Sequence, residues 1–150
     1  MIRRLPASCV DPVLLVGRLL IGGLMFAYGW DKLVSRGLAG TAEGFRKNGV
    51  PLPMASAAFA GIIELVGGAL LILGAATAMV GVLMALEMLG AIVTTGQYHA
   101  VLAQRGGWAL SGSVLAGALI LAAVGAGRYS VDHAVVVRTT SAPEARTRPK

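Results

Sequence analysis

The stretch that decides the fold is GIIELVGG, residues 61–68, because it places a glutamate, Glu64, inside the apolar run 54–76. A run of this length can cross a bilayer, whose hydrocarbon core needs about 20 mostly apolar residues in a helix. An ionisable group at mid-bilayer costs about 2.5–3.5 kcal/mol on insertion scales. Such groups usually face the interior of a helix bundle and pair with one another. Glu64 therefore predicts a bundle with a polar interior.

Three other segments have the length and apolarity of a membrane span, which gives predicted spans at 13–33, 54–76, 78–98 and 108–127. The composition agrees, since 56% of the 150 residues are hydrophobic and 13% are charged, whereas soluble domains carry about 25% charged residues. We predict an all-α integral membrane protein, an antiparallel bundle of four transmembrane helices over residues 13–133. Residues 1–12 form an N-terminal segment, and residues 134–150 a disordered basic tail.

Two connections shape the predicted bundle. Thr77 is nearly the whole link between the second and third spans, so these spans form a tight hairpin, with Gly74 supplying flexibility at the corner. The long connection, residues 35–53, contains a predicted surface helix over 41–47 with Thr41 as its N-cap.

The basic residues predict the orientation. Four spans put both termini on one side, which carries seven Lys and Arg residues, against five on the other side. Because cytoplasmic flanks are enriched in Lys and Arg, we expect both termini in the cytoplasm and a multi-pass protein of the bacterial inner membrane.

Three ionisable residues fall inside the predicted spans: Arg18, Glu64 and Glu87. Each lies on the helical stripe that also carries small residues, which mark close helix contacts in membranes. Their depths along the spans predict an Arg18–Glu87 pair, with Glu64 one step deeper. Two carboxylates against one arginine leave one acid without a full partner, which we expect to be protonated near neutrality. Alternatively, the three form a structural cluster that only fixes helix register.

A protonated acid in an apolar slot suits a quinone, which needs a few polar groups for its carbonyls and no covalent ligand. The same slot could hold another lipid. On the outer side, a cationic vestibule could hold a small anion such as thiosulfate, or its charges could be ordinary solvated loop residues. The residues that form this vestibule are Lys32, Arg36, Arg46, Lys47, His99 and Arg105.

Neither metal nor nucleic-acid sites are predicted. The two histidines, His99 and His133, lie near span ends, and Cys9 is the single cysteine. No haem or metal ligand set is expected from these residues, and one thiol forms no internal disulfide. The net charge of +6 is typical of the loops and tails of a membrane protein, and the sequence contains no nucleic-acid-binding motif.

The sequence resembles the DoxX family of small bacterial membrane proteins. The resemblance is carried by GRLLIGGLMFAYGWDKL at 17–33, FRKNGVPLP at 45–53, IIELVGGALLILGAATA at 62–78 and GAGRYSVDH at 125–133. It implies a four-helix membrane bundle. The family takes its name from a membrane subunit of a thiosulfate:quinone oxidoreductase, while distant relatives act as membrane-protein chaperones or cargo receptors.

We therefore predict a redox-linked membrane subunit that binds a quinone-like lipophile and works with a protein partner or as a homo-oligomer. If it is an enzyme, it is an oxidoreductase subunit of the thiosulfate:quinone type. The alternatives are a non-catalytic scaffold or assembly factor and, less well supported, a small-solute transporter. The predicted catalytic residues are Glu64, Glu87 and Arg18, and the predicted ligand-binding residues are Lys32, Tyr28, Thr94, Tyr98 and His99.

Overall fold

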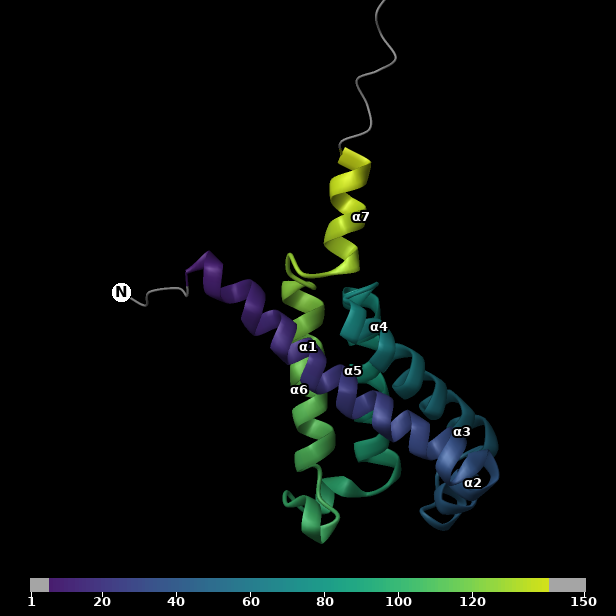
Figure 1. Cartoon of the computed structure of the whole chain (residues 1–150). Coiled ribbons are helices and arrows are strands. Elements are labelled where there is room, and N and C mark those ends of the chain that lie inside the picture. The colour runs from purple at the N-terminus through teal and green to yellow at the C-terminus, as the bar shows by residue number, and fades with distance from the viewer. Residues whose placement is uncertain (1–5, 141–150) are drawn as a thin grey trace, which may run out of the picture.

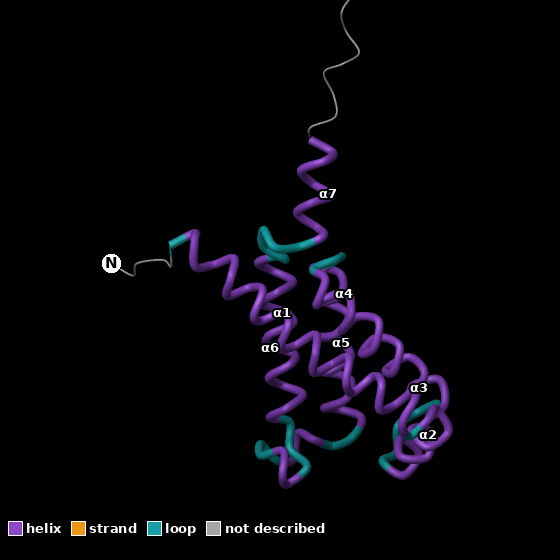
Figure 2. The backbone as a smooth tube through the Cα atoms, in the orientation of Figure 1, coloured by secondary structure: helices purple, strands orange, loops and turns teal. Residues whose placement is uncertain are grey.

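The computed structural model describes residues 6–140, which fold into helices without any strand (Figures 1 and 2). The prediction of an all-α protein is thus confirmed. The helices are α1 (Ala7–Trp30), α2 (Gly37–Lys47), α3 (Pro53–Ile62), α4 (Gly68–Leu73), α5 (Thr77–Thr94), α6 (Ala109–Val124) and α7 (Val131–Thr140). Two π-helical segments, η1 (Asp31–Ser35) and η2 (Ile63–Gly67), continue α1 and α3, and two short 3₁₀ turns, η3 (Gln97–His99) and η4 (Ala103–Arg105), precede α6.

The helices form two closely packed groups. In the first, α1 packs along η2 and α4, and in the second, α5 packs along α6. Small residues allow both contacts, because a Cβ added at Gly22 would lie 2.8 Å from the Gly68 carbonyl oxygen, and one at Gly81 would lie 2.6 Å from that of Ala118. Figure 1 shows the groups meeting near the α4–α5 corner and diverging toward α2 and the loop before α6.

Three helical segments are long and apolar enough to cross a membrane: Cys9–Ser35, Pro53–Leu73 and Thr77–Thr94. The fourth predicted span appears as Ala109–Val124, which is apolar but shorter. Its 16 residues extend about 24 Å at 1.5 Å per residue, less than the hydrocarbon thickness of about 30 Å. The chain therefore has three to four candidate membrane helices.

The segment after α6 folds back over the end of the bundle and joins three elements. The Arg18 guanidinium of α1 is fully buried, and its Nη2 donates to the Tyr129 carbonyl oxygen. The Asp132 carboxylate accepts hydrogen bonds from the backbone N–H groups of Ala76 (2.7 Å) and Thr77 (2.9 Å), at the start of α5. This arrangement corrects the predicted Arg18–Glu87 pair: Arg18 lies in the α4–α5 corner and binds residues that follow α6.

Other predicted elements also differ from the structure. The loop helix begins at Gly37, four residues before the predicted start, and Thr41 is buried inside it rather than capping it. Its hydroxyl donates to the Lys32 carbonyl oxygen at 2.8 Å, which ties α2 to η1. The tail predicted to be disordered from residue 134 is helical as far as Thr140. Residues 1–5 and 141–150 of the predicted terminal segments lie outside the described part.

Gly74→Ala is expected to destabilise the bundle. Gly74 has φ +68°, a left-handed conformation that costs other residues about 1–3 kcal/mol, and a Cβ there would collide with the Arg18 guanidinium. We expect the thermal unfolding temperature in detergent to fall by several degrees. The matched control is Gly23→Ala, where the added Cβ meets no atom within 4 Å. Equal unfolding temperatures for the two variants would contradict this account.

The Asp132 carboxylate is expected to make stability depend on pH. Burial raises its pKa, but the hydrogen bonds from Thr77 and Ala76 outweigh burial and hold the pKa below the usual 3.8. Because the folded-state pKa is the lower one, the stabilisation is complete above the unfolded-state value and is lost as the pH falls through the folded-state value. Asp132→Asn should thus be less stable than wild type at neutral pH, and the difference should shrink below about pH 4. Thermal unfolding across this range tests the prediction, which a pH-independent difference would refute.

Candidate functional site

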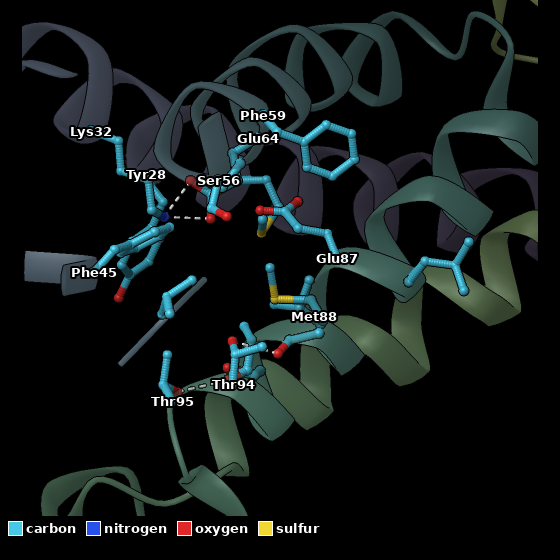
Figure 3. A pocket seen from close by; sticks show the side chains of 18 of the residues that line it. Tyr28, Lys32, Phe45, Ser56, Phe59, Glu64, Glu87, Met88, Thr94 and Thr95 are labelled. Carbon is cyan, nitrogen blue, oxygen red and sulfur yellow. Dashed lines mark hydrogen bonds and ion pairs between the residues drawn. The ribbon is translucent and has the colours of Figure 1, made fainter. Parts of the chain in front are cut away.

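A cavity of about 490 Å³ lies between the two diverging helix groups. Its walls come from α1, η1, α3 and η2 on one side and from α5 and α6 on the other, with Phe45 of α2 and Val50 closing one end. Most lining residues are apolar, and Figure 3 shows the polar ones gathered at its edges. A mostly apolar concavity with a few polar groups is the usual form of a small-molecule site.

Helix α5 contributes one stripe of side chains to the cavity. The stripe runs with the three- and four-residue spacing of a helix face and consists of Leu83, Leu86, Glu87, Gly90, Ala91 and Thr94. Glu87 is the one charged member, so the helix period itself directs this carboxyl group into the cavity.

The opposite wall carries a buried ion pair between Lys32 and Glu64. The Lys32 ammonium donates to both carboxylate oxygens of Glu64, and the two side chains are only 13% and 5% exposed. The ammonium also lies 5.5 Å from the centre of the Tyr28 ring, within range of a cation–π interaction. Two acceptor oxygens and an aromatic face thus surround a charge that would be costly to bury alone.

Both partners of this pair lie in π-helical segments, Lys32 in η1 and Glu64 in η2. Short π-helical turns within α-helices are rare and occur frequently at functional sites. Each wider turn changes the direction of the side chains that follow it by adding a residue to the turn. The coincidence of two such turns at one ion pair favours a ligand site over a contact that only stabilises the fold.

Glu87 reaches this ion pair, and its carboxyl group lies beside the Glu64 carboxylate, within hydrogen-bonding range (Figure 3). Apart from this neighbouring acid, no group among residues 6–140 forms a hydrogen bond with its buried Oε2 atom. Native proteins rarely leave a buried carboxyl oxygen without a partner unless the site has a role that uses it. Within the cavity, Glu87 is therefore the group best placed to meet a ligand.

A second polar group lines the cavity on the side of the loop before α6. It consists of Thr95, Gln97 and Ser111, which are linked by side-chain hydrogen bonds. These residues were not predicted from the sequence, because they lie at a helix end, in a turn and on another helix. The signal available in the sequence was the polar run TTGQ, residues 94–97, at the end of an apolar helix.

The structure brings five of the eight predicted site residues to the cavity: Tyr28, Lys32, Glu64, Glu87 and Thr94. Arg18, Tyr98 and His99 do not line it. Tyr98 and His99 belong to η3, where Tyr98 is exposed and its ring lies 4.2 Å from that of His99. The prediction for these two assumed a helix reaching residue 98, whereas α5 ends at Thr94 and the chain then turns.

The cations of the predicted outer vestibule are largely paired with acids. Lys32 binds Glu64, Arg36 binds Asp31, and Arg46 and Lys47 both contact Glu43. These contacts offset the positive charge that an anion would require, so the anion site stays a prediction without structural support. Within residues 6–140, no group of three or more His, Cys, Asp or Glu side chains is arranged to hold a metal ion.

Comparison with known proteins identifies the family of this chain. The sequence profile of the DoxX family matches residues 13–97, more than half of the length. The chain belongs to the DoxX family. "Uncharacterized membrane protein Rv3486" of Mycobacterium tuberculosis is 30% identical over 140 residues, which cover 87% of this chain and 85% of that protein. The family resemblance read from the sequence is confirmed, and the DoxX chain described here is a membrane protein.

A second relative is named "Putative oxidoreductase CatD", from Bacillus subtilis. It is 43% identical over 77 residues, which are 51% of this chain, and the match spans about half (54%) of CatD. No solved structure matches this DoxX chain significantly.

Removing one charge of the Lys32–Glu64 pair is expected to lower the free energy of unfolding more than removing both charges does. Lys32→Met leaves the Glu64 carboxylate buried without its partner, a change that typically costs about 3–5 kcal/mol. The double variant Lys32→Met/Glu64→Met removes both charges and should recover part or all of that stability. Thermal unfolding of the three proteins in one detergent measures the effect. A double variant less stable than Lys32→Met would be inconsistent with a buried pair.

Proposed function

We propose that this DoxX protein binds a quinone-like lipophile in the cavity and serves as a redox-linked membrane subunit together with a partner protein. The observation that carries the proposal is a second buried acid, Glu87, that lies beside the Glu64 carboxylate of a buried ion pair in an otherwise apolar cavity. The name of CatD as an oxidoreductase agrees with this class of function.

The cavity is accessible from the apolar outer face of the helices. Phe59 of α3 and Leu86 of α5 line the cavity and are 59% and 61% exposed. Leu83 lies one turn from Leu86 and is also exposed. In a bilayer such side chains meet lipid, so a molecule dissolved in the membrane can enter between α3 and α5 without crossing water. This route favours a lipophile over a water-soluble substrate.

The polar groups suit the chemistry of a quinone. A protonated Glu87 donates a hydrogen bond to a carbonyl oxygen, and the Lys32 ammonium stabilises negative charge that develops on the ring. Reduction to the quinol takes up two electrons, which the partner supplies, and two protons, which Glu87 delivers one at a time as it is reprotonated from water between the two transfers. Glu64 holds Lys32 in place and balances its charge.

The remaining features of the proposal concern topology. We propose four membrane spans in the bacterial inner membrane, and the apolar character of α6 supports the fourth. We also propose that both termini lie in the cytoplasm, which the excess of basic residues on the terminal side supports. Contacts between Asp11 and the backbone N–H of Arg128 support the placement of both terminal segments at one end of the bundle.

Glu87→Leu is expected to abolish retention of the lipophile. Leucine keeps the bulk of the side chain but removes the hydrogen-bonding group, whereas Glu87→Gln keeps an N–H donor and should retain the ligand while losing proton transfer. Mass spectrometry of solvent extracts from gently purified proteins measures the bound quinone. Wild type should hold it in stoichiometric amount, and Glu87→Leu should lose most of it while remaining folded.

The control for this experiment is Glu43→Leu, the same substitution at an exposed residue of α2 outside the cavity. It should retain as much quinone as wild type. Wild type with no more quinone than an unrelated membrane protein would contradict the proposal and favour the scaffold or assembly-factor alternative.

A further inference from the structure

We propose that Gln97 supplies a second polar contact, so that the cavity recognises a flat ring with polar atoms on two opposite edges. This inference rests on the proposed function and specifies its substrate class: a para-quinone or its quinol, rather than a lipid with a single polar head. It is carried by the row of neutral side chains, Thr95, Gln97 and Ser111, that lines the cavity.

The hydrogen bonds in this row have a fixed direction. Ser111 Oγ donates to Gln97 Oε1 at 2.8 Å, and Gln97 Nε2 donates to Thr95 Oγ1 at 3.0 Å. The Thr95 hydroxyl in turn donates its one proton to the Ala91 carbonyl oxygen at 2.7 Å. The group that faces Thr95 must therefore be the donor end of the Gln97 amide. The network thus settles the amide orientation, which heavy-atom positions alone would leave open.

Gln97 retains hydrogen-bonding capacity beyond these contacts. A side-chain amide has two N–H donors and an oxygen with two lone pairs, and the row uses one N–H and one lone pair. The second N–H is a neutral donor in the cavity wall, and its amide plane is held by two neighbours. Such a preorganised donor suits a carbonyl or hydroxyl oxygen of a ligand.

The two polar groups lie on different sides of the cavity. Figure 3 shows Thr94 and Thr95 across the cavity from the Lys32–Glu64 pair. Apolar side chains, among them Met25 and Met88, line the space between. A head group with one polar atom would satisfy one side and leave the partly buried donor on the other side without a ligand partner. A ring with oxygens at opposite edges satisfies both sides.

The test compares two probes: a decyl-substituted 1,4-naphthoquinone and the matching 1-tetralone, which lacks the second carbonyl. Tryptophan-fluorescence titration of the protein in nanodiscs gives both dissociation constants. Wild type should bind the dione about 2- to 10-fold more tightly than the monoketone, the effect of one neutral hydrogen bond. Gln97→Met, which removes the amide but keeps the length of the side chain, should lose this preference.

The matched control is Gln104→Met, the same substitution in η4, an exposed turn outside the cavity. It should keep the wild-type preference. If Gln97→Met also keeps it, this inference is overturned while the proposed function stands. If wild type binds neither probe, the proposed function itself fails and this inference fails with it.

A second readout does not depend on the variant folding. Isotope-edited infrared spectra of the dione bound to wild type should show both carbonyl bands shifted to lower frequency, since both oxygens accept hydrogen bonds. A bound dione with one shifted and one unshifted band would overturn the role of Gln97.

Discussion

The ammonium of Lys32 and the carboxylate of Glu64 meet away from solvent, and the geometry of the cavity depends on that contact. The other ion pairs described within residues 6–140 join partly exposed side chains and contribute little. Burying two charges is favourable only when their geometry is close and their remaining hydrogen-bonding capacity is used. The pair therefore fixes how η1 lies against η2. It also sets the position of the Glu64 carboxylate, beside which the second acid, Glu87, lies without an ion pair of its own.

The molecule has a second buried cation, Arg18, which stabilises the other end of the bundle. Arg18 reaches the α4–α5 corner and the Tyr129 carbonyl, where the chain folds back after α6 and Asp132 binds the start of α5. One end of the bundle is thus held by hydrogen bonds among three segments. The other end diverges and encloses the cavity (Figure 1). This separation explains how so small a helical protein can hold an opening between its helices: the closed end supplies the fixed geometry, and the ion pair positions the open end.

Much of this could be predicted from the sequence because apolar runs and helix period are local properties. They located Glu64 and Glu87 on inward-facing stripes of their helices. The pairing of charges could not be predicted, because it depends on two π-helical segments and on a backward fold of residues 125–132 that brings Tyr129 to Arg18. Gln97 and Ser111 meet only once the turn after α5 has formed. The same turn, beginning after Thr94, directs Tyr98 away from the cavity.

We propose that the cavity between Glu87 and Gln97 is a ring-binding site open to lipid. A high-resolution cryo-electron microscopy structure of gently purified protein in nanodiscs, enlarged by a bound antibody fragment, tests it most directly. We expect flat density in the cavity, within hydrogen-bonding distance of Glu87 and of the Gln97 amide, with a chain leaving past Phe59. A cavity that has collapsed, or that holds only a lipid acyl chain, would contradict the account.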